Sequence, residues 1–178
     1  MSEPLFDTAP DFDQPIAVLK HCHDRIRKQL ATLQKLSDHL PQHGADDNAR
    51  KSAAAVLKYF NNAAPNHHQD EEHDLLPMLK ATAVNQDAAM LVDLMPQILA
   101  EHAQMDAIWE ALASQLASIA AGSAAMLDDA RVSEFTVLYA SHMEKEEGSI
   151  APMAKRIFSD TQMAALGNAM RARRGIAS

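Results

Sequence analysis

The segment from residue 91 to residue 119 repeats an apolar side chain at alternating steps of three and four positions, with a single exception. These steps follow the 3.6-residue period of an α-helix, so the segment predicts one helix about eight turns long whose apolar face packs against other helices. His102 is the exception, because it stands where the register requires an apolar residue. The full stripe is Leu91, Met95, Ile98, His102, Met105, Trp109, Leu112, Leu116 and Ile119.

Three other segments show the same helical spacing, and each one also places a histidine in the apolar register. The first begins near Asp13, a candidate N-cap, with Pro15 in its first turn. The other two begin near Asp46 or Asp47 and near Asp128. The inward histidines of these three segments are, in chain order, His23, His67 and His142.

Proline and glycine residues predict where these helices bend or end. The segment His39–Asn48 contains one proline and one glycine and is expected to be a loop, and Gly122 is expected to stop the third helix. Pro65 lies inside the second helix, where it removes one backbone hydrogen bond and should kink the helix just before His67. The residues after Ser159 are expected to form a short terminal helix.

Four long amphipathic helices joined by loops of ordinary length predict an antiparallel up-down-up-down four-helix bundle. The chain has 178 residues and is 47% hydrophobic, which is ample for one core and marginal for two. Aromatic residues make up only 4% and glycines number five, which is few for an all-β protein. We therefore predict an all-α fold with an N-terminal arm (1–13), one bundle domain (14–158), and a short C-terminal helix and tail (159–178).

The composition argues against several classes of partner and location. The formal net charge of -8 at pH 7 disfavours a surface for nucleic acid or anionic membranes. No stretch approaches the roughly 18 apolar residues that a membrane span needs. Cys22 is the only cysteine, so no internal disulfide can form, and the N-terminus has neither a basic segment nor an apolar run typical of export. We therefore expect a cytoplasmic monomer or homodimer.

Two of the predicted helices carry a glutamate one turn after the inward histidine, since Glu71 follows His67 and Glu146 follows His142. Residues four apart lie about 6 Å apart along the helix axis and about 40° around it, so each pair can bind a common centre. In an antiparallel bundle these two helices both face the interior, and the other two inward histidines then lie on opposite sides of the cluster. The predicted metal ligands are His23, His67, Glu71, His102, His142 and Glu146.

The chemistry of this set favours a metal over an ordinary core. A single inward histidine is more often a hydrogen-bonded core residue than a ligand, but a buried glutamate is rare because an unpaired carboxylate in an apolar interior is costly. Four imidazoles and two carboxylates suit iron, manganese or zinc and disfavour calcium or magnesium. If both glutamates bridge two irons, the protein supplies four bonds per metal, and an oxo or hydroxo bridge raises this to five. Open positions then remain for a small oxidant.

Two further residues stay open as ligands. His68 lies about 100° around the helix from His67, and it is a ligand, a hydrogen-bonding partner of a ligand, or merely partly buried. Asp106 follows His102 by one turn, on the shoulder of the stripe, and is an alternative ligand.

Several other charged side chains are assigned to solvated surfaces. Glu72, Glu144 and Glu147 lie off the inward stripes, so we expect them to face water. Near the C-terminus, a cluster of three arginines is interpreted as a frayed, solvated tail, with a docking element as the alternative. These arginines are Arg171, Arg173 and Arg174.

From residue 14 to about residue 156, the chain resembles the hemerythrin-like, or HHE cation-binding, family. The segments that carry the resemblance are LKHCHDRIRKQL, NHHQDEEHDLLPML, AEHAQMDAIW and SHMEKEEGSIAPM. The resemblance implies a non-haem di-iron centre with the same six ligands that the periodicity predicts.

Two departures from the oxygen-carrying hemerythrins are informative. Those carriers have a second histidine one turn after the first on the third helix, where this chain has Asp106. They also end in a histidine and an aspartate five apart, where this chain has His142 and Glu146, four apart. Both departures argue against reversible oxygen carriage, because fewer nitrogen ligands should leave the irons more open and more reactive.

Three functions remain open at this point. The first is a di-iron protein that binds or reduces dioxygen, peroxide or nitric oxide in sensing or stress defence, with peroxide or nitric oxide consumption as the enzymatic form. Its cofactor would be two iron ions, with manganese or zinc as alternatives. The second is a metal-responsive binding module or iron store without turnover, and the third is a bundle used only as a scaffold.

Overall fold

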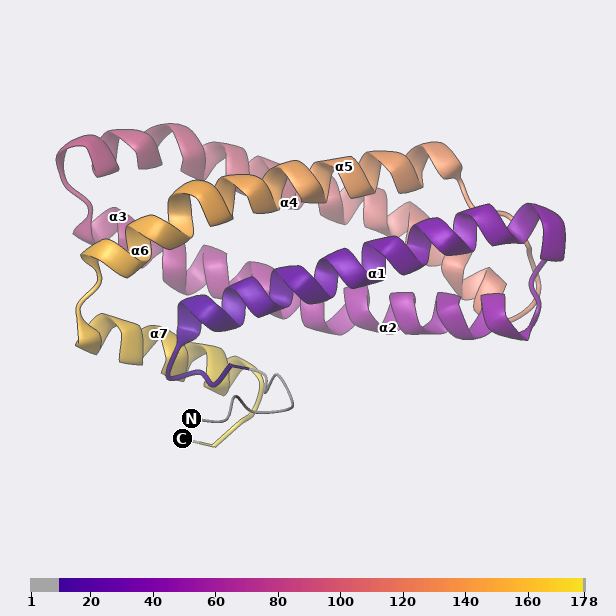
Figure 1. Ribbon diagram of the computed structural model, residues 1–178, viewed down its shortest axis with the longest axis horizontal. Helices are drawn as coiled ribbons and strands as arrows, with labels where there is room; N and C mark the ends of the chain where they lie inside the picture. Colours follow the sequence, from indigo (N-terminus) through magenta and orange to yellow (C-terminus); the bar gives the residue numbers. More distant parts are fainter. Residues whose placement is uncertain (1–9, 178) are drawn as a thin grey trace, which may run out of the picture.

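A computed structural model describes residues 10–177 of the chain, and within them the fold is all-α, as the sequence predicts. Four long antiparallel helical stretches run up, down, up and down, and a shorter helix packs at one end (Figure 1). The elements are α1 (Pro15–His43), α2 (Asp47–Gln69), the π-helix η1 (Asp70–Leu75), α3 (Leu76–Thr82), α4 (Asn85–Ala120), α5 (Asp129–Lys145), the π-helix η2 (Glu146–Ile150), α6 (Ala151–Ile157) and α7 (Asp160–Arg173). Of the predicted N-terminal arm, residues 1–9 lie outside the described residues.

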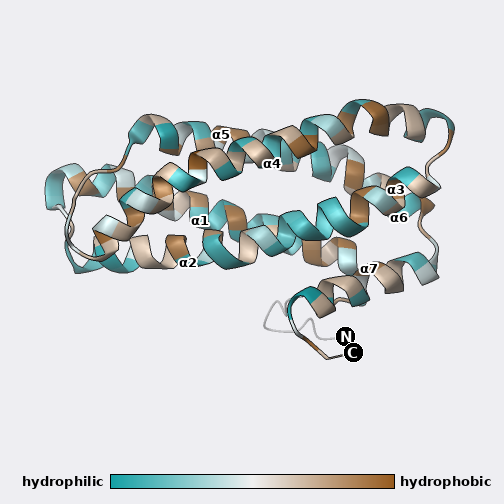
Figure 2. Cartoon of the chain, turned by 180° about the vertical axis from the view of Figure 1, so that it is seen from behind, coloured by the Kyte–Doolittle hydropathy of each residue, from teal (hydrophilic) through white to brown (hydrophobic). Residues whose placement is uncertain are grey.

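The bundle is closed by contacts between neighbouring helices, since α1 and α4 each pack against both α2 and α5. Hydrophilic and hydrophobic segments alternate along each helix, as expected for amphipathic helices (Figure 2). Among residues 10–177, no helix combines the length and the apolar character that crossing a membrane requires.

Local signals at the helix ends explain most of the boundaries. The carboxylate of Asp46 accepts the backbone N–H of Ala49 at 2.8 Å and caps α2. Asp128 caps α5 in the same way, and Ser159 opens α7 with a capping box. Gly122 follows α4 with a φ of 74°, a left-handed conformation that glycine adopts without strain.

Two predictions about α1 are wrong. Its N-cap is Gln14 and not Asp13, whose carboxylate instead bonds a guanidinium of α7. The predicted loop at His39–Asn48 is largely helical, because α1 continues through Pro41 to its last residue, His43. The stabilisation from burying Leu36 and Leu40 on the extended apolar stripe offsets the hydrogen bond that the proline removes.

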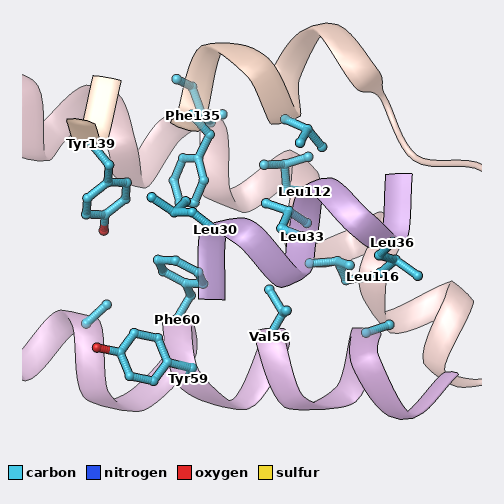
Figure 3. Packing of buried hydrophobic residues seen from close by; sticks show 14 of the residues in the cluster. Leu30, Leu33, Leu36, Val56, Tyr59, Phe60, Leu112, Leu116, Phe135 and Tyr139 are labelled. Atoms are coloured by element: carbon cyan, nitrogen blue, oxygen red, sulfur yellow. The ribbon is translucent and has the colours of Figure 1, made fainter. Parts of the chain in front are cut away.

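The apolar core consists of two clusters separated by a polar layer. The larger cluster contains Phe60, Phe135 and the leucines of the second half of α1, and Figure 3 shows these side chains interleaving between the helices. The smaller cluster gathers residues from the start of α1, from α3, α4 and α6, and from α7. In sequence, the inward histidines and glutamates fall between the two clusters on every long helical stretch, so apolar side chains seal the polar layer from both ends.

The sequence pattern did not predict the two π-helical segments. Each one interrupts an α-helix where a predicted ligand glutamate lies, with Glu71 second in η1 and Glu146 first in η2. A π turn holds more residues than an α turn. The residues that face the bundle interior after the π turn are therefore not the ones that an unbroken α-helix would bury. In the second stretch this shift buries Leu79, while its neighbour Met78 is only partly buried.

Candidate metal centre

The structure brings all six predicted ligand residues together in the polar layer, and each of them is 4% exposed or less. They come from four helical stretches, so no single stretch could form the cluster alone. His23 lies on α1, His67 on α2, Glu71 on η1, His102 on α4, His142 on α5 and Glu146 on η2. Each π segment therefore contributes one glutamate, placed one turn after the histidine of the preceding α-helix.

The potential ligand atoms form two groups that share both glutamates. In the first group, atoms of His23, His67, Glu71 and Glu146 all lie within 4.8 Å of one another. The second group combines the same two glutamates with His102 and His142, under the same distance limit. Two cations side by side would therefore each find two imidazole nitrogens and two carboxylate oxygens.

The two oxygens of Glu71 face different groups. Its Oε1 is 3.1 Å from His67 Nε2, and its Oε2 is 3.3 Å from His102 Nε2. Glu146 is arranged likewise, with Oε2 3.0 Å from His23 Nε2 and Oε1 3.2 Å from His142 Nε2. Each glutamate thus has the orientation of a bridge between two neighbouring ions.

Several of these atoms lack hydrogen bonds although they are fully buried. Among the described residues, none of the short contacts of His23 Nε2, His67 Nε2, Glu71 Oε2 and Glu146 Oε2 has the geometry of a hydrogen bond. Burying a polar atom without a partner costs free energy, and such atoms are uncommon in folded proteins. All four belong to the two ligand groups, and cations at the centre would satisfy them. The residues present therefore fit a pair of metal ions.

Three of the four histidines contact a second carboxylate through Nδ1. His23 Nδ1 lies 2.9 Å from Glu147, and His102 Nδ1 lies 2.6 Å from Glu72. The third contact joins His142 Nδ1 to Glu101 at 2.9 Å. A histidine that donates from Nδ1 presents the lone pair of Nε2, so these carboxylates orient the imidazoles towards the centre and make them better ligands. In the described structure, Nδ1 of the fourth histidine, His67, has no such partner.

These contacts correct part of the sequence interpretation. Glu72 and Glu147 were expected to face water, yet both are half-buried against ligand histidines, whereas Glu144 is exposed as predicted. Glu101, the third of these carboxylates, lies outside the residues that the apolar periodicity singles out. The sequence does contain a signal for these three carboxylates, since each of them is adjacent to a predicted ligand: Glu72 to Glu71, Glu147 to Glu146, and Glu101 to His102. Adjacent residues on one helix can face two different neighbouring helices.

Burial and charge set the protonation of the metal-free site. Burial lowers the pKa of His23 and of His142, but the carboxylates of Glu146 and Glu71 outweigh it and raise these pKa values to about 10 and about 9. For Glu71, burial raises the pKa, but the neighbouring histidines outweigh it and hold the pKa well below its ordinary value. Burial dominates at His67 and lowers its pKa. A cation would therefore have to displace protons from His23 and His142.

The two residues left open as ligands lie outside both groups. His68 is buried, stacks on the His102 ring with centroids 4.0 Å apart, and has its Nε2 3.3 Å from the hydroxyl of Tyr139. None of its three predicted roles describes it, because it is buried, belongs to neither ligand group, and contacts the ligand His102 by ring stacking while its hydrogen-bond contact is with Tyr139. Asp106 is exposed on α4, and neither ligand group includes it.

The C-terminal arginines do not form a solvated tail, so that interpretation was wrong and its alternative, a docking element, describes them. Asp70, the first residue of η1, is 0% exposed and bonds both Arg173 and Arg174, the latter at 2.6 Å. Arg173 also reaches Asp74 at 2.6 Å. The third arginine bonds aspartates that precede α1. This contact, which we call the arginine clamp (Asp70, Asp74, Arg173 and Arg174), holds α7 against the segment that carries Glu71.

A cavity of about 590 Å³ joins the surface to the first ligand group. Its deep end is formed by His23, Glu71 and Glu146, and its rim includes the exposed residues Lys20 and Lys155. Most other lining side chains are apolar and come from the start of α1, from η2 and from α6. A small molecule can therefore approach the carboxylates from one side of the bundle.

Comparison with known proteins gives two matches. Residues 14–154 match the hemerythrin HHE cation binding domain. A protein of Haemophilus influenzae, described only as uncharacterized, is 28% identical over 165 residues, which cover 93% of this chain and 92% of that protein. The family match covers nearly the whole bundle and every residue of the two ligand groups.

Proposed function

The chain belongs to the hemerythrin HHE cation-binding domain family, and we propose that it holds two iron ions that react with dioxygen, peroxide or nitric oxide in sensing or stress defence. The observation that carries this proposal is the orientation of Glu71 and Glu146, since in each glutamate one carboxylate oxygen faces the first group of buried donors and the other oxygen faces the second group. Glu71 and Glu146 would thus be shared by two ions, which could then act as a pair.

The donor set supports iron among the possible metals. His23 and His67 would hold one ion, His102 and His142 the other, and the glutamates would bridge them. Mixed imidazole and carboxylate ligands suit iron, manganese or zinc, and the single cysteine, Cys22, is not part of either ligand group. When bound, a pair of irons supplies electrons and Lewis acidity to a small oxidant.

The rest of the chain would prepare the site for this chemistry. Glu147, Glu72 and Glu101 orient three of the imidazoles, and the two apolar clusters exclude water from either end of the polar layer. The cavity provides an approach for the oxidant beside His23. Protons can be delivered or taken up at Glu147, which is half-buried and bonded to both His23 and Arg27.

The arginine clamp favours a second candidate function, a module whose partner contacts depend on metal. Asp70 is the immediate neighbour of Glu71, so binding of a cation by Glu71 acts on the residue that holds α7. A metal that binds only the folded state would stabilise the protein and fix α7 in place. This function predicts a large metal-dependent change in stability with little turnover.

Metal analysis combined with optical spectra tests the proposal. Purified protein loaded with ferrous iron without oxygen should contain two irons per chain, and exposure to dioxygen or peroxide should produce new absorption while the oxidant is consumed. The matched control replaces Glu144, an exposed neighbour of η2, by alanine and should behave as the unchanged protein. A content well below two ions per chain with iron, manganese and zinc alike would overturn the proposal.

A further inference from the structure

Closely packed rings lead from the candidate metal centre towards the surface. His68 lies over His102, a predicted ligand, with ring centroids 4.0 Å apart and ring planes 13° apart. Tyr139 follows, with its ring centroid 5.9 Å from that of His68 and its hydroxyl 3.3 Å from His68 Nε2. These contacts connect a tyrosine of the apolar core directly to a histidine of the polar layer.

Beyond Tyr139 the rings continue to the only tryptophan in the chain. Phe135 lies 4.9 Å from Tyr139 and 5.7 Å from Trp109, measured between centroids, and Phe60 lies 5.7 Å and 4.9 Å from the same two rings. Figure 3 shows Phe60, Phe135 and Tyr139 gathered in the space between α2 and α5. Trp109 is half-buried and donates its Nε1–H to Asn61 at 2.9 Å. We call this series of rings, from His68 to Trp109, the aromatic path.

The hydroxyl of Tyr139 has a partner that can accept a proton. A tyrosine gives up an electron readily only when its phenolic proton leaves at the same time, because the protonated radical is a very strong acid. Tyr139 is 2% exposed, so water cannot easily take this proton, but the imidazole nitrogen of His68 can. The other tyrosine, Tyr59, is also buried, yet its hydroxyl bonds the backbone carbonyl of Cys22 at 3.4 Å, which cannot accept a proton.

We propose that Tyr139 is a one-electron donor to the metal centre, with His68 as the acceptor of its proton and Trp109 as the point where the electron is replaced. This inference rests on the proposed reaction of the metal pair with peroxide. Reducing one hydrogen peroxide to two waters takes two electrons and two protons. Where one of the two electrons is not available from the metal pair, Tyr139 would supply it through the stacked rings of His68 and His102 and pass its phenolic proton to His68 Nε2. The two protons that form water would come from solvent through the cavity beside His23.

The return step restores Tyr139 and His68, and a second electron from the same external reductant would restore the metal pair. The oxidised Tyr139 takes an electron from Trp109 and takes its proton back from His68. A soluble one-electron reductant such as ascorbate then reduces Trp109, which lies at the outer end of the aromatic path. Each cycle therefore consumes one external electron for each electron that Tyr139 supplies, and no proton is left on His68.

Freeze-quenched electron paramagnetic resonance tests the proposal in iron-loaded protein mixed with hydrogen peroxide. The chain has two tyrosines and one tryptophan, so a tyrosyl signal can be assigned by two variants. We expect the signal in the unchanged protein and in Tyr59→Phe, and its loss in Tyr139→Phe. Unchanged thermal stability and iron content in Tyr139→Phe would show that only the hydroxyl matters. An equal signal in Tyr139→Phe, or no signal in protein that consumes peroxide, would overturn the proposal.

A metal-free experiment separates this inference from the proposed function. In the metal-free protein, a photogenerated one-electron oxidant in solution, a ruthenium(III) complex, should oxidise Trp109 and then Tyr139, giving a tyrosyl signal that Tyr139→Phe abolishes and Tyr59→Phe keeps. Failure of peroxide consumption together with this result would refute the proposed peroxide reaction while supporting the Tyr139–His68 pair. A metal-free signal that survives in Tyr139→Phe would refute the pair itself.

The role of Trp109 has its own measurement. In iron-loaded protein with ascorbate, the tyrosyl signal should persist longer in Trp109→Phe than in the unchanged protein, because the electron can no longer be replaced through the indole. Phenylalanine keeps an aromatic ring against Phe60 and Phe135, so packing is largely retained. Equal decay in both proteins would remove Trp109 from the proposal.

Discussion

The two π segments, η1 and η2, each contribute one glutamate to the candidate metal centre, but different contacts hold them in place. In both, a histidine precedes the glutamate by one turn, and a proline follows six residues after the glutamate, Pro77 after Glu71 and Pro152 after Glu146. Both segments line the cavity, η1 through Glu71 and Leu75 and η2 through Glu146, Glu147 and Ile150. The arginine clamp holds η1 from outside, whereas η2 carries the exposed Gly148. The two segments therefore share the opening to solvent and differ in the further helix that fixes η1.

The largest expected effect is a loss of metal affinity, and it tests whether η1 and η2 contribute equally to the centre. Replacing Glu71 or Glu146 by alanine should lower metal affinity by more than about 100-fold, beyond the range seen for residues that only support a ligand, because each glutamate serves both ions. The two variants should be equally defective although their segments are supported differently. Competition with a chelator measures the affinity, and Glu144→Ala serves as the control. Two ions retained in either variant would show that its glutamate is not a bridge.

The second prediction concerns the pH dependence of metal binding, because the ligand histidines differ in their protonation in the metal-free protein. The pKa of His142, before η2, is raised to about 9, and that of His23 to about 10, whereas burial lowers the pKa of His67, before η1. At pH 7, His23 and His142 are therefore protonated, and each must release a proton to bind a cation. Metal affinity should therefore rise with pH, by up to about 100-fold per pH unit for two protons, and level off above about pH 10.

The same pKa values predict the stability of the metal-free protein. A raised pKa means that protonated His23 and His142 stabilise the folded state. This contribution is fully present below their ordinary pKa of 6.5 and is lost as the pH rises through about 9 and about 10. Urea unfolding at several pH values measures it. Stability that rises over this alkaline range would contradict the assignment.

The fourth prediction concerns the arginine clamp. Asp70→Ala leaves Arg173 and Arg174 beside a buried, empty position and should destabilise the metal-free protein by about 3 kcal/mol, the low end for removing one partner of a buried ion pair. The equivalent position before Glu146 is Lys145, which contacts Glu101 but is partly exposed. Lys145→Ala should therefore cost only about 0.5 kcal/mol. Similar losses in the two variants would remove the distinction between the segments.

The smallest effect is expected at Gly148. A Cβ built at this residue meets no atom within 4 Å, and its backbone φ is not positive. Alanine should therefore stabilise η2 by about 0.5 kcal/mol, because glycine loses more backbone freedom on folding. Thermal unfolding with and without metal measures the change. A clear loss of stability would show that the π turn itself requires glycine.

The residues that the sequence could place are those whose position follows from helical periodicity. The all-α bundle is confirmed, and His23, His67, His102 and His142 lie inside because they continue apolar stripes that must be buried. A residue off the stripe is harder to place, because periodicity along one helix does not show which neighbouring helix will cover its flank. For this reason the sequence pattern predicts that Glu72 faces water, whereas in the structure it contacts His102.

The amino-acid sequence by itself determined the number and direction of the long helices and the set of side chains in the polar layer, because both depend on contacts that repeat every three or four residues along one helix. Only the tertiary structure decided the π segments, the carboxylates behind the histidines and the docking of α7 on Asp70. The contacts behind the histidines and the docking of α7 join residues far apart in the chain, so their free energy depends on which helices become neighbours.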